Sequence, residues 1–205
     1  MHPPPLVRFA LGIGVAVPFL YYGTQLIAAK FYPGYSFLSQ AASMLGSDLA
    51  PLPWIFNSGA FAVGFASFIA AYGFLRALLF LGSRPAWAWL VAFSLAVGAV
   101  AAIKAAAFPL PHRYHGSGPL TIGVLLLPTL LLAALWKRDD ARAMRWYLAA
   151  TNLLILAMIP VMSGMTGLDT TPYIGINQRI ATLAIYPPIG VAAWYLLRRL
   201  RRPIR

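Results

Sequence analysis

Two histidines lie three residues apart in a proline-rich segment of the sequence. His112 and His115 fall within Phe108–Gly116, and this spacing places both on one face only if the backbone is helical. Imidazole can transfer protons or ligate a metal near neutral pH. A metal would need further ligands, which Asp48 or Asp169 could supply. We predict these four side chains as catalytic candidates, without a metal or a cofactor; purely structural histidines are the alternative.

Three polar residues, Asn177, Gln178 and Arg179, precede the last apolar segment almost at membrane level. Polar groups at that depth are costly unless they are paired or functional. Guanidinium binds phosphate or carboxylate through two hydrogen bonds, so we predict Arg179 as the main ligand contact. The alternative is an ion pair with Asp169 or Asp48 that ties the loops together. The full set of predicted ligand-binding residues is Arg179, Gln178, Asn177, Arg113, Ser39, Ser43 and Asn57.

The first long polar loop combines a turn with a helix-like pattern. Tyr32–Tyr35 reads as a turn, and Ser36, Ser39 and Ser43 then recur at helical spacing before Gly46. The segment is too short to cross a membrane, so we expect a short amphipathic helix at the interface. This helix either caps the bundle or forms a polar lid over a head-group site.

The composition excludes an ordinary soluble domain. Of the 205 residues, 60% are hydrophobic and only 10% are charged, whereas soluble chains are about a quarter charged. The chain has no Cys, which excludes disulfides, thiolate metal sites and iron–sulfur clusters. The surface must therefore face lipid.

Six apolar segments are long enough to cross a bilayer, which takes roughly 20 helical residues. They cover about residues 7–29, 53–75, 86–107, 117–136, 146–163 and 180–197. We expect one all-α membrane domain over residues 1–205, a bundle of six transmembrane helices. The first segment has no small-residue cleavage signal before Tyr21, so we predict a retained span and not a signal peptide.

Lys and Arg are unevenly divided between the two sides of this bundle. With the N-terminus in the cytoplasm, twelve fall on the inner side and four on the outer side. The outer four are Lys30, Lys104, Arg113 and Arg179. The positive-inside rule therefore predicts that both termini are cytoplasmic. This orientation puts the three long loops, 31–52, 108–116 and 164–179, on the outer face.

Most of the net charge of +12 is then explained by the orientation of the protein in the membrane. Because the basic residues lie between apolar runs and are not gathered on one water-facing surface, we predict no nucleic-acid binding. Arginines near the C-terminus are expected to attract anionic lipids of the inner leaflet, at about 1 kcal/mol each. They are Arg198, Arg199, Arg201, Arg202 and Arg205.

Prolines interrupt several of the predicted spans. Pro18, Pro128, Pro160 and the pair Pro187-Pro188 each free backbone carbonyls and favour a kink. Lipid cannot satisfy those carbonyls, so neighbouring helices, hydroxyl side chains or water must do so. The pattern fits a compact bundle with an outward-facing cavity.

Several separated motifs occur in an order shared with a known membrane family. They are Tyr32–Gly46, Pro53–Gly59, Phe108-Pro109 followed by His115-Gly116, and Gly175–Ile180. In these motifs the chain resembles the six-helix family named domain of unknown function 998, over most of its length. The resemblance implies a bacterial or archaeal plasma-membrane protein with no assigned chemistry. A fainter likeness, in the first loop and the His before span four, is to proteins of the damage-regulated autophagy modulator and GPI-lipid remodelling type, and it hints at lipids.

Three functions stay open from the residues alone. The main hypothesis is an outer-face polar site that binds or modifies a lipid head group, with Arg179 on the phosphate and a carboxylate and an imidazole moving protons. The alternatives are a small transporter or lipid-handling protein with an outward cavity, and an accessory membrane protein without catalysis. All four Asp lie in loops and no span contains a His pair, which argues against an ion pump and a di-haem cytochrome.

Overall fold

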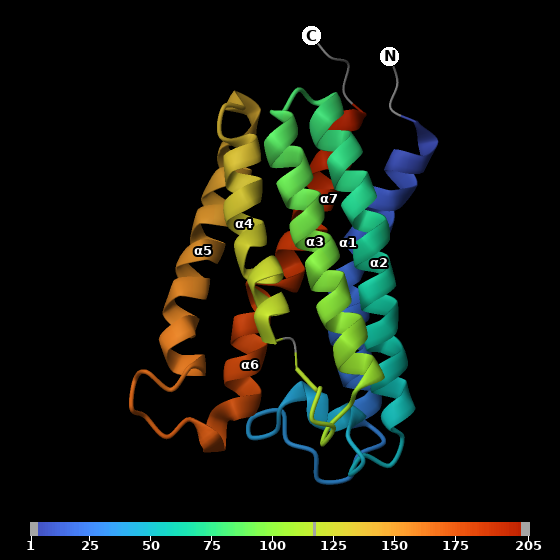
Figure 1. Cartoon of the computed structure of the whole chain (residues 1–205), viewed down its shortest axis with the longest axis vertical. Helices are drawn as coiled ribbons and strands as arrows, with labels where there is room; N and C mark the ends of the chain where they lie inside the picture. Colours follow the sequence, from blue (N-terminus) through green and yellow to red (C-terminus); the bar gives the residue numbers. More distant parts are fainter. Residues whose placement is uncertain (1–3, 117, 202–205) are drawn as a thin grey trace.

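The regular secondary structure of the described chain is entirely helical (Figure 1). A computed structural model describes residues 4–116 and 118–201. The α-helices are α1 (Pro5–Ala29), α2 (Pro53–Phe80), α3 (Pro85–Ala107), α4 (Thr121–Leu135), α5 (Arg142–Met162), α6 (Ile174–Leu183) and α7 (Tyr186–Leu200). Short 3₁₀ helices are η1 (Ala42–Gly46), η2 (Gly118–Leu120), η3 (Asp139–Ala141) and η4 (Thr171–Tyr173). The predicted all-α class is confirmed.

Six helical segments of the described chain are long and apolar enough to span a membrane, as predicted. Helices α1 to α5 supply five of them, and α6 and α7 together supply the sixth. Helix α2 continues to Phe80, beyond the predicted limit at 75, because Arg76 lies exposed near its end and its long side chain can reach the interface. The predicted fourth span began at residue 117, which lies outside the described residues.

The last predicted span, about 180–197, is confirmed as one apolar membrane-crossing segment, and its helix is interrupted beside the proline pair where a kink was expected. Helix α6 ends at Leu183 and α7 begins at Tyr186. Pro187 and Pro188 stand in the first turn of α7 and lack the N–H groups that would continue the hydrogen-bond ladder of α6. Irregular backbone at membrane depth is tolerated where protein covers it or where it lines a cavity.

Helix α6 also begins earlier than expected. It starts at Ile174, so Asn177, Gln178 and Arg179 lie inside a helix and not in a loop ahead of the span. The short helix expected near residues 36–46 is a bend and turns followed by η1, whose residues Ala42, Leu45 and Gly46 are buried. Helix α6 contacts η1, so the polar triplet and the first loop meet.

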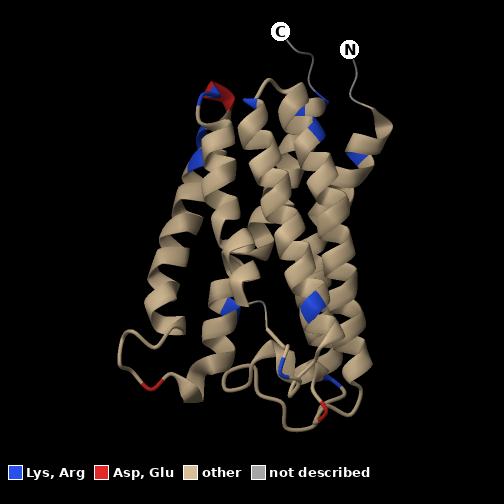
Figure 2. Cartoon of the chain, viewed as in Figure 1, with Lys and Arg blue, Asp and Glu red and all other residues tan. Residues whose placement is uncertain are grey.

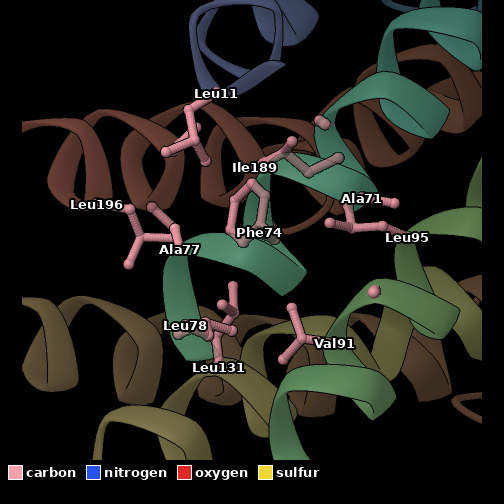
Figure 3. Packing of buried hydrophobic residues seen from close by; sticks show 14 of the residues in the cluster. Leu11, Ala71, Phe74, Ala77, Leu78, Val91, Leu95, Leu131, Ile189 and Leu196 are labelled. Carbon is pink, nitrogen blue, oxygen red and sulfur yellow. The ribbon is translucent and has the colours of Figure 1, made fainter. Parts of the chain in front are cut away.

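Helix α2 packs against α1, α3 and α7. Its Phe74 is wholly buried among Leu11 of α1, Ile189 of α7 and Leu131 of α4 (Figure 3). A Cβ atom on Gly73 would meet the backbone nitrogen of Leu11 at 2.9 Å, so α1 and α2 cross at a distance that requires a small residue.

The bundle has two dissimilar ends (Figure 1). At the terminal face lie the start of α1, the end of α7, the α2–α3 turn and the α4–α5 connection. At the loop face lie the three long connections 31–52, 108–116 and 163–173. Figure 2 shows that Lys and Arg gather at the terminal face, with fewer at the loop face. The assignment of the terminal face to the cytoplasm stays a prediction, and Arg202 and Arg205 of the C-terminal cluster lie outside the described residues.

Asp140 joins the end of α7 to the α4–α5 connection. Its carboxylate forms ion pairs with Arg138 at 3.0 Å and Arg199 at 3.1 Å. Exposed pairs contribute about 0.2–1 kcal/mol each, so we expect Asp140→Asn to lower the thermal unfolding temperature in detergent by roughly 2–4 °C. The difference should shrink at about 1 M salt. Asp139→Asn is the control, because Asp139 has no ion pair with any described residue; equal effects of both changes would contradict the prediction.

Candidate functional site

The first loop is fastened to the start of α6 through the main chain. The N–H of Ile176 donates to the carbonyl of Leu38 at 3.0 Å. A Cβ atom on Gly175 would meet the carbonyl oxygens of Gln40, Phe37 and Leu38 at 2.5, 2.6 and 2.8 Å. Only glycine permits this approach. The position of Gly175 in the sequence therefore determines where the first loop packs on α6.

Arg179 holds the same loop with its guanidinium group. Its Nη1 donates to the carbonyls of Phe37 at 2.8 Å, Gln40 at 3.1 Å and Gly175 at 2.8 Å, and its Nη2 donates to the Tyr35 hydroxyl at 2.6 Å. The Nε atom is buried without a partner. The guanidinium also lies over the Phe37 ring, 4.6 Å from its centroid. Arg179 thus acts as a clamp on backbone carbonyls.

The alternative of an ion pair between Arg179 and a carboxylate is not formed. Asp48 and Asp169 are both exposed, and the ion pairs among described residues involve Asp140. The Asp169 carboxylate accepts the N–H of Thr171 at 3.0 Å, and hydrogen bonds from the side chain and backbone of Thr171 lower its pKa. Asp169 therefore stabilises a surface turn.

Tyr35 completes the clamp between loop and helix. Burial raises the pKa of its hydroxyl, and the hydrogen bond from Arg179 offsets part of that rise. The hydroxyl therefore stays protonated at neutral pH, and it donates towards the carbonyls of Gln40 at 3.2 Å and Ala41 at 3.1 Å.

Two amide side chains hold the two ends of η1. The Oε1 atom of Gln178 accepts the N–H of Ala42 at 2.6 Å. The Nδ2 atom of Asn57 donates to the carbonyl of Gly46 at 3.0 Å. Both residues were predicted as ligand contacts, and in the structure both position the first loop.

The second loop places its two histidines differently. His115 is half-buried, and its Nδ1 lies 2.8 Å from the carbonyl oxygen of Phe108. Because a carbonyl only accepts, Nδ1 must carry the proton, which makes Nε2 the acceptor of the neutral ring. His112 is exposed, and its Nδ1 accepts the N–H of Tyr114 at 3.1 Å. Arg113 donates to the Tyr114 hydroxyl at 2.7 Å and is also exposed.

A cavity of about 230 Å³ lies beneath these loops. Its walls come from α1, η1, α2, α3, the second loop, α4, α6 and α7, and thus from every span except that of α5. Its apolar lining includes Phe56, Val63 and several alanines. The residues that carry polar groups are Tyr21, Ser43, His115, Thr121, Gln178, Thr182 and Tyr186. Among the described residues of the lining there is no Asp, Glu, Lys or Arg, so the cavity offers hydrogen bonds without a carboxylate, ammonium or guanidinium group.

Three predicted residues, Ser43, His115 and Gln178, meet at this cavity. The other predicted side chains do not line it. Of these, Arg179 and Asn57 position the first loop, Asn177 is half-buried in α6, and His112, Arg113, Ser39, Asp48 and Asp169 are exposed. No group of three or more His, Asp or Glu side chains capable of holding a metal occurs in residues 4–116 and 118–201.

The tyrosines and threonines of the cavity were not predicted from the sequence. Tyr21 and Tyr186 stack with ring centroids 3.7 Å apart, which joins α1 to the break before α7. Gln178, Thr182 and Tyr186 recur every fourth residue, a spacing that would have marked one polar stripe on the last span. The break at Ala184–Ile185 brings Ile185 and Tyr186 into the same wall as Gln178 and Thr182.

Comparison with protein-family models identifies the family of the chain. The model of the family described as "Protein of unknown function (DUF998)" matches residues 15–195. The chain therefore belongs to this family, which confirms the resemblance seen in its motifs. Neither the curated proteins nor the solved structures contain a significant match.

Proposed function

We propose that this DUF998 membrane protein binds the polar head group of a lipid in the cavity beneath its loop face. The observation that carries the proposal is the convergence of polar side chains from three sequence regions, Ser43, His115 and Gln178, on one cavity. Polar groups inside a bundle are costly unless they are paired or functional. Gln178 and His115 each use one atom to bond the protein, at Ala42 and Phe108, and both residues also border the cavity.

The size and lining of the cavity restrict the ligand. A volume of about 230 Å³ is below the 300–1,000 Å³ of drug-sized sites, so it suits a head-group fragment better than a whole lipid. The absence of charged residues from the lining favours hydroxyl-rich or amide-containing groups over a bare phosphate. With Nδ1 bonded to the carbonyl of Phe108, His115 leaves Nε2 as the ring nitrogen available to such a group.

The geometry favours binding over catalysis. The catalytic hypothesis pairs an imidazole with a carboxylate that moves protons beside it. His115 lines the cavity, but Asp48 and Asp169 lie exposed in the loops. A catalytic role of His112, Asp48 and Asp169 would require these loops to move.

Removing the imidazole from the cavity should weaken lipid retention. We expect His115→Ala to lower the affinity for co-purified lipid by about 2- to 10-fold, the value of one lost hydrogen bond. Native mass spectrometry of the purified protein measures the retained fraction and identifies the lipid class. His112→Ala is the matched control, because His112 is exposed and does not line the cavity.

A substitution that fills the cavity tests whether the lipid binds there, without removing a polar group. Ala102→Leu adds volume to the lining, whereas Ala107→Leu makes the same change at an exposed position of the same helix. Lipid should be lost from the first variant alone. If His115→Ala and Ala102→Leu keep the same lipid as the two controls, the proposal is wrong.

The broken last span supports a second candidate, a small lipid carrier. Discontinuous helices beside a binding site are typical of transporters, and Thr182, Ile185 and Tyr186 place the break in the cavity wall. Carriage differs from binding in one measurable way: a carrier reconstituted in vesicles would move a labelled lipid between leaflets, and a binding protein would not.

A further inference from the structure

A larger groove lies at the opposite end of the bundle, away from the proposed head-group cavity. It has a volume of about 640 Å³ and lies between the α2–α3 turn, α3 and the end of α4. We name it the terminal groove. It is lined by Leu81, Gly82, Ser83, Arg84, Trp87, Thr129, Leu132, Ala133, Ala134, Trp136, Lys137 and Arg138.

Within the part of the chain that the structure describes, three basic side chains and no acidic one line the terminal groove. Arg138 forms a 3.0 Å ion pair with Asp140, and it also donates to the carbonyl of Leu81 at 2.7 Å. Arg84 and Lys137 are exposed, and their side chains form no hydrogen bond or ion pair with described residues. The groove therefore presents two positive charges without a counter-ion.

Tryptophans and an apolar wall accompany these charges. Trp87 is half-buried and Trp136 is exposed, and the two side chains come from α3 and α4. Trp is enriched where a helix leaves the hydrocarbon for the head-group region. Leu132 and Ala133 of α4 continue the lining one turn deeper into the span. The groove thus has a cationic outer part and an apolar inner part.

The geometry points to a binding site for one anionic phospholipid, with its phosphate between Arg84 and Lys137 and an acyl chain along the apolar wall. Positive charge at the rim complements the phosphate, and the apolar lining complements the chain. This site differs from the described part of the C-terminal arginine cluster, because Arg198, Arg199 and Arg201 do not line the groove. It is also independent of the proposed head-group cavity, with which it shares no lining residue.

A water-soluble phosphate compound would satisfy only part of the groove. It could pair with Arg84 and Lys137, but it would leave Trp87, Leu132 and Ala133 in contact with membrane lipid or detergent. A lipid satisfies both parts at once. The occupant is therefore expected to need its acyl chains, which separates a lipid site from a simple phosphate site.

The test measures phospholipid binding to the full chain in neutral detergent by native mass spectrometry. Phosphatidylglycerol should bind in preference to phosphatidylcholine. Each basic side chain near an anionic lipid contributes about fivefold in affinity, so Arg84→Gln/Lys137→Gln should weaken phosphatidylglycerol binding about 30-fold. Lys137→Gln alone should weaken it about fivefold, which keeps the test valid if the double variant is unstable.

The control removes the same charge from the same face. Arg76→Gln/Arg142→Gln replaces two exposed basic residues of α2 and α5 that do not line the terminal groove, and it should weaken binding less than threefold. Equal losses in the two double variants would mean general surface attraction and would overturn the proposal. So would an absence of preference for phosphatidylglycerol, or equally tight binding of glycerol phosphate.

Discussion

Gly175→Ala is expected to destabilise the protein by about 3 kcal/mol, which corresponds to a fall of roughly 6–12 °C in thermal unfolding temperature. The added Cβ atom would lie 2.5–2.8 Å from three backbone carbonyl oxygens of the first loop. Backbone cannot rotate away as a flexible side chain can, so the loop must lift from α6. The hydrogen bond between Ile176 and Leu38 would be lost with it.

Glycines of α1 provide the control for that change. A Cβ atom on Gly12 or Gly23 would meet nothing within 4 Å, and alanine is the better helix former by about 0.8–1 kcal/mol. Gly12→Ala should therefore leave the melting temperature unchanged or raise it. Limited proteolysis should cut the first loop, residues 31–52, faster in Gly175→Ala than in Gly12→Ala. Identical melting and cleavage of the two variants would show that the loop does not depend on Gly175.

The membrane architecture could be predicted from the sequence because lipid thickness imposes one length on every span. Apolar runs near 20 residues therefore locate the helices without knowledge of their neighbours. The last span departs from this rule because Pro187 and Pro188 act on backbone hydrogen bonds, which run lengths do not describe. Pro18, Pro128 and Pro160 lie inside continuous helices, whereas the pair ends one.

The candidate site was only partly predictable for a different reason. Polar residue types in the loops indicated Ser43, His115 and Gln178, but the tyrosines of the cavity look like ordinary span residues. Only the packing of α1 against α7 brings Tyr21 onto Tyr186. The partners of Arg179 were also invisible, because they are backbone carbonyls up to 142 positions away, and every residue type has a carbonyl.

Arg179→Lys distinguishes the clamp from the phosphate-binding role predicted from the sequence. The guanidinium donates four hydrogen bonds in a fixed planar arrangement. The ammonium group of the shorter lysine side chain cannot reproduce that arrangement. At about 1 kcal/mol for each net hydrogen bond, Arg179→Ala should lower the melting temperature by roughly 8–16 °C. Arg179→Lys should lower the melting temperature by more than half of that amount.

A residue that held an anionic ligand through its charge would behave differently. Lysine would then preserve most of the function, and the protein free of ligand would melt almost normally in both variants. Arg113→Ala is the matched control on the same face, because Arg113 contacts only its neighbour Tyr114 through its guanidinium and is exposed. Arg113→Ala should change the free energy of unfolding by no more than about 0.5 kcal/mol. Wild-type-like melting of lipid-free Arg179→Lys would contradict the clamp and return Arg179 to the role of a ligand contact.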